Sequence, residues 1–165
     1  MNRTPNSCAV NYYGVMDSPR WLGQDEQQAW RAYLDATRLL LRDLDNQLTR
    51  DSGISFTDFE LLVVLSEAPD RRRRMSELAD AVTTTRSGVT RAISRLVDCG
   101  WVRRVKCDDD KRGMSAEITE AGLSTLADAS LGHVAAVRQN MFDLVDPKDL
   151  GALTRTFSAM RSHAS

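Results

Sequence analysis

Apolar residues recur at three- and four-residue intervals over most of the chain, and this spacing predicts a mainly helical protein. The first such segment runs from Gln24 to Leu48 and ends at a break formed by Asp51, Ser52 and Gly53. The predicted helix is long for a chain of 165 residues. Its apolar stripe therefore favours a partner subunit, although the same stripe could also cover a single core.

Capping residues mark the next helix. Ser55 and Asp58 have the spacing of a capping box, and Ile54 is placed to pack on Phe59. A helix is therefore expected to start after Ser55 and to end before Pro69, because proline disfavours helical geometry in the residue before it.

A basic connection follows, from Arg71 to Arg74, with a short extended piece predicted at Arg74 and Met75. The alternative interpretation of such a run is an ordinary solvated loop. Ser76 is then expected to start a short helix whose apolar face includes Leu78.

The stretch from Thr83 to Thr119 is the predicted functional part of the chain. It opens with a helix that has one apolar and one polar face. The apolar face consists of Val89, Ala92, Ile93, Leu96 and Val97. The open face consists of Ser87, Gly88, Thr90, Arg91, Ser94, Arg95 and Asp98. An ordinary solvated face is the alternative, but this one carries small hydroxyls and arginines and neither Glu nor Lys, which suits close approach to guanine or phosphate.

Two short helices joined by the polar turn Val82 to Thr85 form a helix-turn-helix arrangement, which places its second helix in the major groove of DNA. Cys99 and Gly100 are expected to close this helix. Two β-prone segments follow, Trp101 to Lys106 and Met114 to Ile118, joined by a charged turn.

The aspartates of that turn would repel phosphate, so they need an explanation. We expect Asp110 to pair with Arg112 and hold the tip in shape, which leaves part of the guanidinium free to enter a minor groove. The alternative is an unremarkable charged hairpin.

The remaining residues predict two more helices. Thr119 caps one whose apolar positions continue to Leu144, and Asp146 with Pro147 opens the last. The predicted fold is mainly α with a small antiparallel β wing. Its segments are a flexible arm (1–23), an N-terminal dimerisation helix (24–53), a winged helix-turn-helix lobe (54–119) and C-terminal dimerisation helices (120–165).

The formal net charge of −1 hides an uneven distribution. Between Arg71 and Gly113 there are twelve Arg or Lys residues and six Asp or Glu residues, a balance of +6, and the remainder of the chain carries −7. Local positive charge of this kind is what phosphate binding requires. The sequence has no apolar run of membrane-spanning length and no secretory signal, so we expect a cytoplasmic protein.

Catalytic, metal and disulfide chemistry find little support. Cys8, Cys99 and Cys107 have no metal-ligand or paired spacing, so no metal and no cofactor is expected. His133 and His163 lie on separate late helices without a nucleophile or acid pair at useful spacing, which disfavours an enzyme. We expect His133 at the surface or at an interface.

Several short motifs together resemble the MarR family of bacterial transcriptional regulators. They are Ser76-Glu77-Leu78-Ala79, Thr85 to Thr90, Leu96 to Val102, and Asp110 to Gly113 followed by Ile118-Thr119-Glu120-Ala121-Gly122. The likeness covers about Gln24 to Met160 in helix order, and Asp-x-Arg with the later Thr-Glu-Ala-Gly is its most specific part. Ile118 stands where the family usually has Leu.

The resemblance implies a homodimeric winged helix-turn-helix protein that binds a pseudo-palindromic operator, with Arg112 as the wing arginine and Asp110 as its brace. We expect a repressor. The residues predicted to bind DNA are Arg74, Ser76, Thr84, Thr85, Arg86, Ser87, Thr90, Arg91, Ser94, Arg95, Lys111 and Arg112.

The resemblance also implies sensing. Many family members release DNA when a small aromatic or anionic effector binds, and Trp30, Tyr33 and Phe59 are candidates for the cleft, with plain core packing as the alternative. Oxidation of a cysteine is a second way of sensing. A winged-helix module that binds proteins without reading DNA is the competing function, although it would be expected to lose the Arg/Ser/Thr face.

Overall fold

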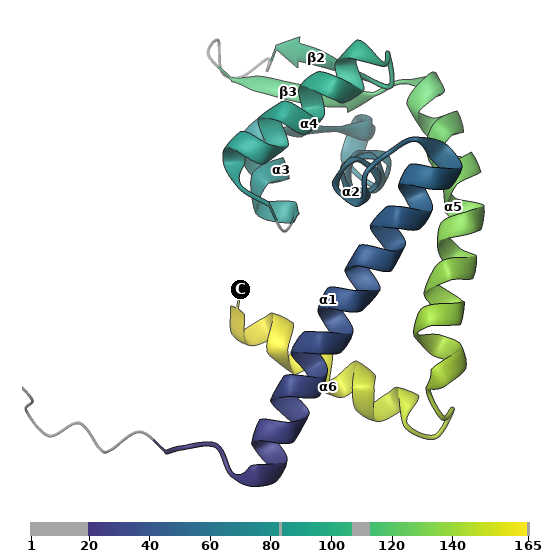
Figure 1. Cartoon of the computed structure of the whole chain (residues 1–165). Helices are drawn as coiled ribbons and strands as arrows, with labels where there is room; N and C mark the ends of the chain where they lie inside the picture. Colours follow the sequence, from purple (N-terminus) through teal and green to yellow (C-terminus); the bar gives the residue numbers. More distant parts are fainter. Residues whose placement is uncertain (1–19, 83, 107–112, 165) are drawn as a thin grey trace, which may run out of the picture. The chain divides into compact units, whose positions relative to one another are not determined.

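The computed structural model describes residues 20–82, 84–106 and 113–164 (Figure 1). The chain divides into two compact units, Met1–Ala36 and Thr37–Ser165, and the division falls within the first helix, α1 (Gln24–Ser52). In the part of α1 that belongs to the second unit, Leu44 and Leu48 are buried. Gly53 then adopts a φ of +69°, a left-handed conformation that suits glycine and stops the helix at the predicted break.

Helix α2 (Phe56–Ser66) starts where its capping residues predict. Ser55 Oγ accepts a hydrogen bond from the Asp58 backbone N–H, and the Asp58 carboxylate accepts one from the Ser55 N–H, so the predicted capping box is confirmed. Ile54 and Phe59 both belong to the buried core.

The segment after α2 corrects two predictions. A 3₁₀ turn, η1 (Pro69–Arg71), leads into strand β1 (Arg72–Arg74), so the extended piece lies before Met75 and does not include it. Helix α3 (Met75–Ala81) begins one residue before Ser76, with Arg74 as its N-cap and no side-chain cap. The reason is strand pairing, because Arg74 lies opposite Ser115 and the chain turns into the helix directly after that pair.

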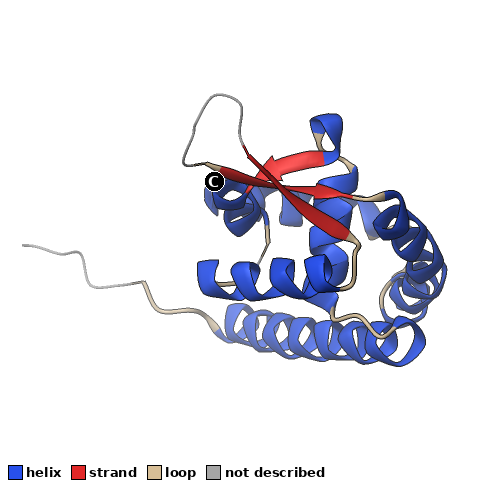
Figure 2. Ribbon diagram, turned by 90° about the horizontal axis from the view of Figure 1, so that it is seen from above, coloured by secondary structure: helices blue, strands red, loops and turns tan. Residues whose placement is uncertain are grey.

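The predicted helix with two unlike faces and the two strands after it are confirmed, although the first strand does not include Trp101. Helix α4 (Arg86–Asp98) buries Val89, Ala92, Ile93 and Leu96, and Gly100 follows it with a φ of +75°. Strands β2 (Val102–Lys106) and β3 (Met114–Ile118) pair antiparallel, and β1 adds to the other edge of β3 in the order β1-β3-β2 (Figure 2).

One hydrophobic core joins these elements. Its fully buried side chains include Leu61, Leu62 and Leu65 of α2, Leu78 of α3 and Ile93 of α4. The apolar face of α4 is therefore used in packing, and its polar face is left outward.

The C-terminal helices differ from their predicted bounds. Helix α5 (Glu120–Asn140) is capped by Thr119 as predicted, but it ends before Leu144, because Met141 leaves helical geometry and a 3₁₀ turn, η2 (Phe142–Leu144), follows. Helix α6 (Leu150–Ala164) begins after Asp146 and Pro147, since the Asp146 backbone carbonyl accepts the Asp149 N–H in a turn. No helix of the described part is both long and apolar enough to span a membrane.

His133, which we expected at the surface or at an interface, is half-buried. Its ring lies 4.4 Å from that of Phe59 and 6.1 Å from that of Phe56, centroid to centroid. Its Nδ1 is buried, with no hydrogen-bond partner among the residues that the structure describes. Burial lowers the pKa of His133 because the charged imidazolium would lose its hydration.

This burial predicts a pH-dependent stability. The neutral ring is favoured in the folded state, so its contribution is complete above the unfolded pKa of about 6.5 and is lost as the pH falls through the lower folded value. We expect the urea midpoint to fall between pH 7.5 and pH 5, and to fall less in His133→Gln. Equal pH dependence in both proteins would contradict this assignment.

Candidate nucleic-acid interface

Helices α3 and α4 follow one another along the chain and contact each other (Figure 1). Thr85 caps α4, because its hydroxyl accepts a hydrogen bond from the Gly88 N–H at 3.1 Å. A Cβ on Gly88 would lie 2.6 Å from Thr84 Oγ1 and 3.2 Å from Thr85 Oγ1, so a larger residue at position 88 would require these side chains to move.

The polar side chains predicted from sequence gather along the outer face of α4. Thr85, Arg86, Ser87, Thr90, Arg91 and Arg95 are exposed, and Thr84 and Ser94 are half-buried. The guanidinium groups of Arg86 and Arg91 make no hydrogen bond or ion pair within the described residues, although the Arg86 carbonyl accepts one from Thr90 Oγ1 at 3.0 Å. Two arginines in the N-terminal half of a helix, flanked by small hydroxyls, can approach a groove and donate to bases or phosphates.

The C-terminal half of the same face is already engaged. Arg95 Nη2 donates to Asp58 Oδ1 at 2.7 Å, and Arg104 Nη2 donates to Ser94 Oγ at 2.7 Å. The sequence predicted Ser94 and Arg95 as DNA contacts, whereas the structure ties both to neighbouring elements.

The other residues predicted to bind DNA do not belong to α4. Arg74 and Ser76 are exposed at the junction of β1 and α3. Lys111, Arg112 and the brace Asp110 lie outside the described residues, as do Cys8 and Cys107. Cys99 is exposed at the C-terminal cap of α4. The structure thus leaves the wing tip and the cysteine hypothesis untested.

Three residues that are not among the predicted DNA contacts contribute to the site: Gly88, Asp58 and Arg104. Asp58 was assigned only to the capping box, and its second role depends on a contact with α4 that is 37 positions away in sequence. A glycine at the third helical position after a polar turn was a usable signal for Gly88. For Arg104, one arginine among several in a strand, sequence carries no signal.

The aromatic residues proposed for an effector cleft fall in two units. Trp30 and Tyr33 stack with ring centroids 6.0 Å apart in the first unit, and both are exposed. Phe59 is 7% exposed and belongs to the core of the second unit, where it contacts His133.

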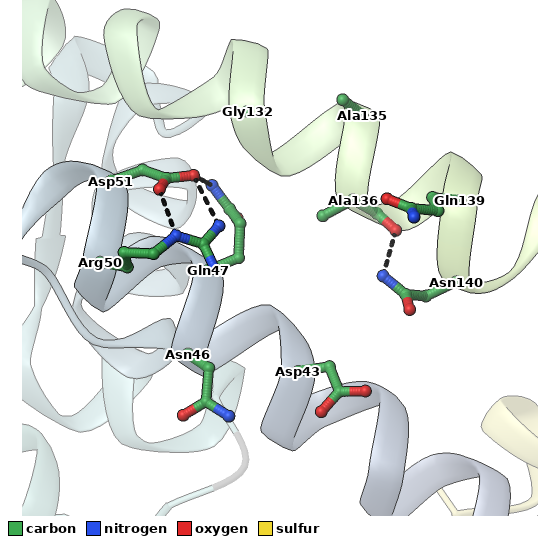
Figure 3. A pocket seen from close by; sticks show the side chains of 10 residues that line it. All are labelled: Asp43, Asn46, Gln47, Arg50, Asp51, Gly132, Ala135, Ala136, Gln139 and Asn140. Atoms are coloured by element: carbon green, nitrogen blue, oxygen red, sulfur yellow. Dashed lines mark hydrogen bonds and ion pairs between the residues drawn. The ribbon is translucent and has the colours of Figure 1, made fainter.

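A polar groove of about 490 Å³ lies between α1 and α5 within the second unit (Figure 3). Gln47 and Asp51 line one wall, where Gln47 Nε2 donates to Asp51 Oδ2 at 3.0 Å and Arg50 Nε donates to Asp51 Oδ1 at 2.8 Å. The hydrogen bonds from Arg50 and Gln47 lower the pKa of Asp51. Gln139 and Asn140 line the opposite wall, so this groove is built from amides and charges, with no aromatic ring in its lining.

A buried three-helix core, a small antiparallel sheet and an outward polar α4 define the winged helix-turn-helix class of protein. The sequence model of the MarR family matches residues 52–113. Over its length the chain resembles Sco3205 of Streptomyces coelicolor, a MarR family transcriptional regulator solved in complex with DNA. The two share 43% identity over 90% of this chain and 92% of that one, with a TM-score of 0.83.

A second Streptomyces coelicolor regulator of the family, AbsC, is 39% identical over 88% of this chain and 98% of its own, with a TM-score of 0.80. The transcriptional repressor YetL of Bacillus subtilis is 33% identical over 101 residues, which span 59% of each protein. The chain therefore belongs to the MarR family of transcriptional regulators.

Proposed function

We propose that the protein is a repressor that binds a pseudo-palindromic DNA operator as a homodimer. The observation that carries this proposal is the outward face of α4, where exposed Arg86, Ser87, Thr90 and Arg91 lie on a helix whose opposite face is fixed in the core. The DNA complex of Sco3205 and the repressor YetL support the same function.

Exposed apolar side chains outside the lobe support the dimer. In the second unit they include Leu131, Val134, Leu144, Leu150, Phe157 and Met160. Leu131 and Leu144 are each 78% exposed, which is unusual for large aliphatic residues on packed elements. A second copy of the chain is the partner that would cover them, since the terminal helices are expected to form the dimer.

An effector that releases the DNA is part of the same proposal. The α1–α5 groove has the volume of a small-molecule site. Its polar lining favours an effector with several hydrogen-bonding groups. The test is to add candidate aromatic acids to the complex of the protein with its operator. Release of the DNA by an acid, together with weaker release in the Asn46→Ala variant of the groove wall, would support this assignment. If no acid releases the DNA, the assignment is contradicted.

The function is tested by selecting duplexes from a random pool with the wild-type protein. We expect enrichment of an inverted repeat, because two identical recognition helices related by a two-fold axis read the same bases on opposite strands. A pool without any enriched sequence would contradict specific DNA readout. It would favour the competing function, a winged-helix module that binds another protein.

A further inference from the structure

One carboxylate joins the start of α2 to the polar face of the recognition helix. Asp58 Oδ2 accepts hydrogen bonds from the Ser55 N–H at 3.3 Å and from Ser55 Oγ at 2.7 Å. Its other oxygen, Oδ1, accepts the hydrogen bond from Arg95 Nη2 at 2.7 Å. The Asp58 side chain is only 9% exposed, so both sets of contacts are shielded from water on the Asp58 side.

The anchor behind this carboxylate is rigid. Asp58 lies in the first turn of α2, and the same helix buries Leu61, Leu62 and Leu65 completely. The hydrogen bond between Asp58 and Arg95 therefore fixes α4 relative to the buried core.

A second contact reaches α4 from the sheet. Arg104 of β2 donates to Ser94 Oγ, and that hydroxyl in turn donates to the Thr90 carbonyl at 2.9 Å. Ser94 and Arg95 are neighbours, so the C-terminal half of α4 is held at adjacent positions by α2 and by β2. The N-terminal half, with Arg86 and Arg91, has no such polar tie in the described residues.

We propose that Asp58 and Arg104 are positioning residues for operator recognition, and that Arg95 and Ser94 are their anchor points on α4, with no base or phosphate contact of their own. This inference rests on the proposed DNA-binding function. Apolar packing alone allows a helix to rotate or slide slightly, whereas two directional hydrogen bonds fix its rotation. The side chains of the N-terminal half then meet the groove at a set angle.

The test is a double-mutant cycle of Asp58→Asn and Arg95→Gln on the selected operator and on a scrambled duplex of equal length, over a range of salt concentrations. We expect each single variant to lower the ratio of operator to scrambled affinity by roughly tenfold, as for a lost base contact. The double variant should lower this affinity ratio no more than either single variant does, because both substitutions remove the same hydrogen bond. The slope of log affinity against log salt should stay unchanged.

Two patterns would overturn the brace. If Arg95 contacts phosphate, Arg95→Gln should reduce the salt slope by about one unit. It should also lower the operator affinity by the same factor in the Asp58→Asn background as in the wild-type protein. Thr119→Ala is the control, since it removes the cap hydroxyl of α5 and contacts neither Asp58 nor Arg95. It should lower thermal stability and leave the affinity ratio unchanged, and an equal fall in the ratio would reduce the role of Asp58 to stability alone.

Failure of the inference and failure of the proposed function give different results. A wild-type protein without preference for any duplex would refute both. Wild-type preference with either overturning pattern would refute the brace only. If Asp58→Asn does not fold, Ser94→Ala and Arg104→Gln form a second cycle on the other contact, with the same expected pattern.

Discussion

Arg91→Ala is expected to weaken operator binding by roughly 10- to 100-fold, the loss that corresponds to about 1–3 kcal/mol for an arginine that donates to a base or phosphate. Arg91 is exposed on the outer face of α4, opposite the buried Val89 and Ile93. Its removal leaves the core untouched, so the thermal midpoint should stay close to that of wild type. Fluorescence anisotropy titrations and thermal melts of the same samples measure both effects.

Arg112→Ala completes this prediction, because the resemblance to the family makes Arg112 the wing arginine. It should also weaken binding, and the salt slope should fall by about one unit if Arg112 contacts phosphate. Arg155→Ala on α6 is the control, since it removes the same charge outside the lobe. Unchanged binding by both Arg91→Ala and Arg112→Ala would refute the site assignment.

Gly122→Val is expected to have the largest effect on stability, a loss of about 3 kcal/mol or more. A Cβ at Gly122 would lie 2.2 Å from the Trp101 carbonyl oxygen and 2.8 Å from Ile118 Cγ1. The same carbonyl accepts the Thr119 N–H at 2.9 Å, so the backbone there cannot move away without breaking a hydrogen bond between the wing and α5. The first turn of α5 must therefore shift as a unit.

Urea titration measures this loss, and Gly151→Ala on α6 is the matched control. The nearest atom to a Cβ there is the tip of Arg155 at 3.5 Å, and alanine favours the helix, so stability should stay equal or rise. A Gly122→Val protein within about 0.5 kcal/mol of wild type would contradict the close packing of wing and helix.

Local signals in the sequence predicted most of the fold. Ser55 and Asp58 marked a helix start because a capping box is complete within four residues. The three- and four-residue spacing of apolar positions identified the buried face of α4. This signal, like the capping box, depends only on residues that are close along the chain. The resemblance to a family then correctly indicated the winged helix-turn-helix class.

The errors and omissions share a different cause, which is long-range contact. The strand at Arg72–Arg74 forms because β3, some forty positions later, offers a free edge, and three arginines carry no signal of that pairing. The hydrogen bond from Arg95 to Asp58 could not be predicted from the sequence for the same reason. The contact of His133 with Phe59 has no local signal either, because it joins residues of α5 and α2 that are far apart in the sequence.

The claim that a symmetric dimer reads a DNA operator is tested most directly by a nuclease or hydroxyl-radical footprint of the wild-type protein on the selected duplex. Two recognition helices related by a two-fold axis reach the same side of the double helix when their sites are one turn apart. The predicted result is protection of two inverted half-sites whose centres are about 10 bp apart. Protection of a single half-site, or none above that of a scrambled duplex, would contradict the account.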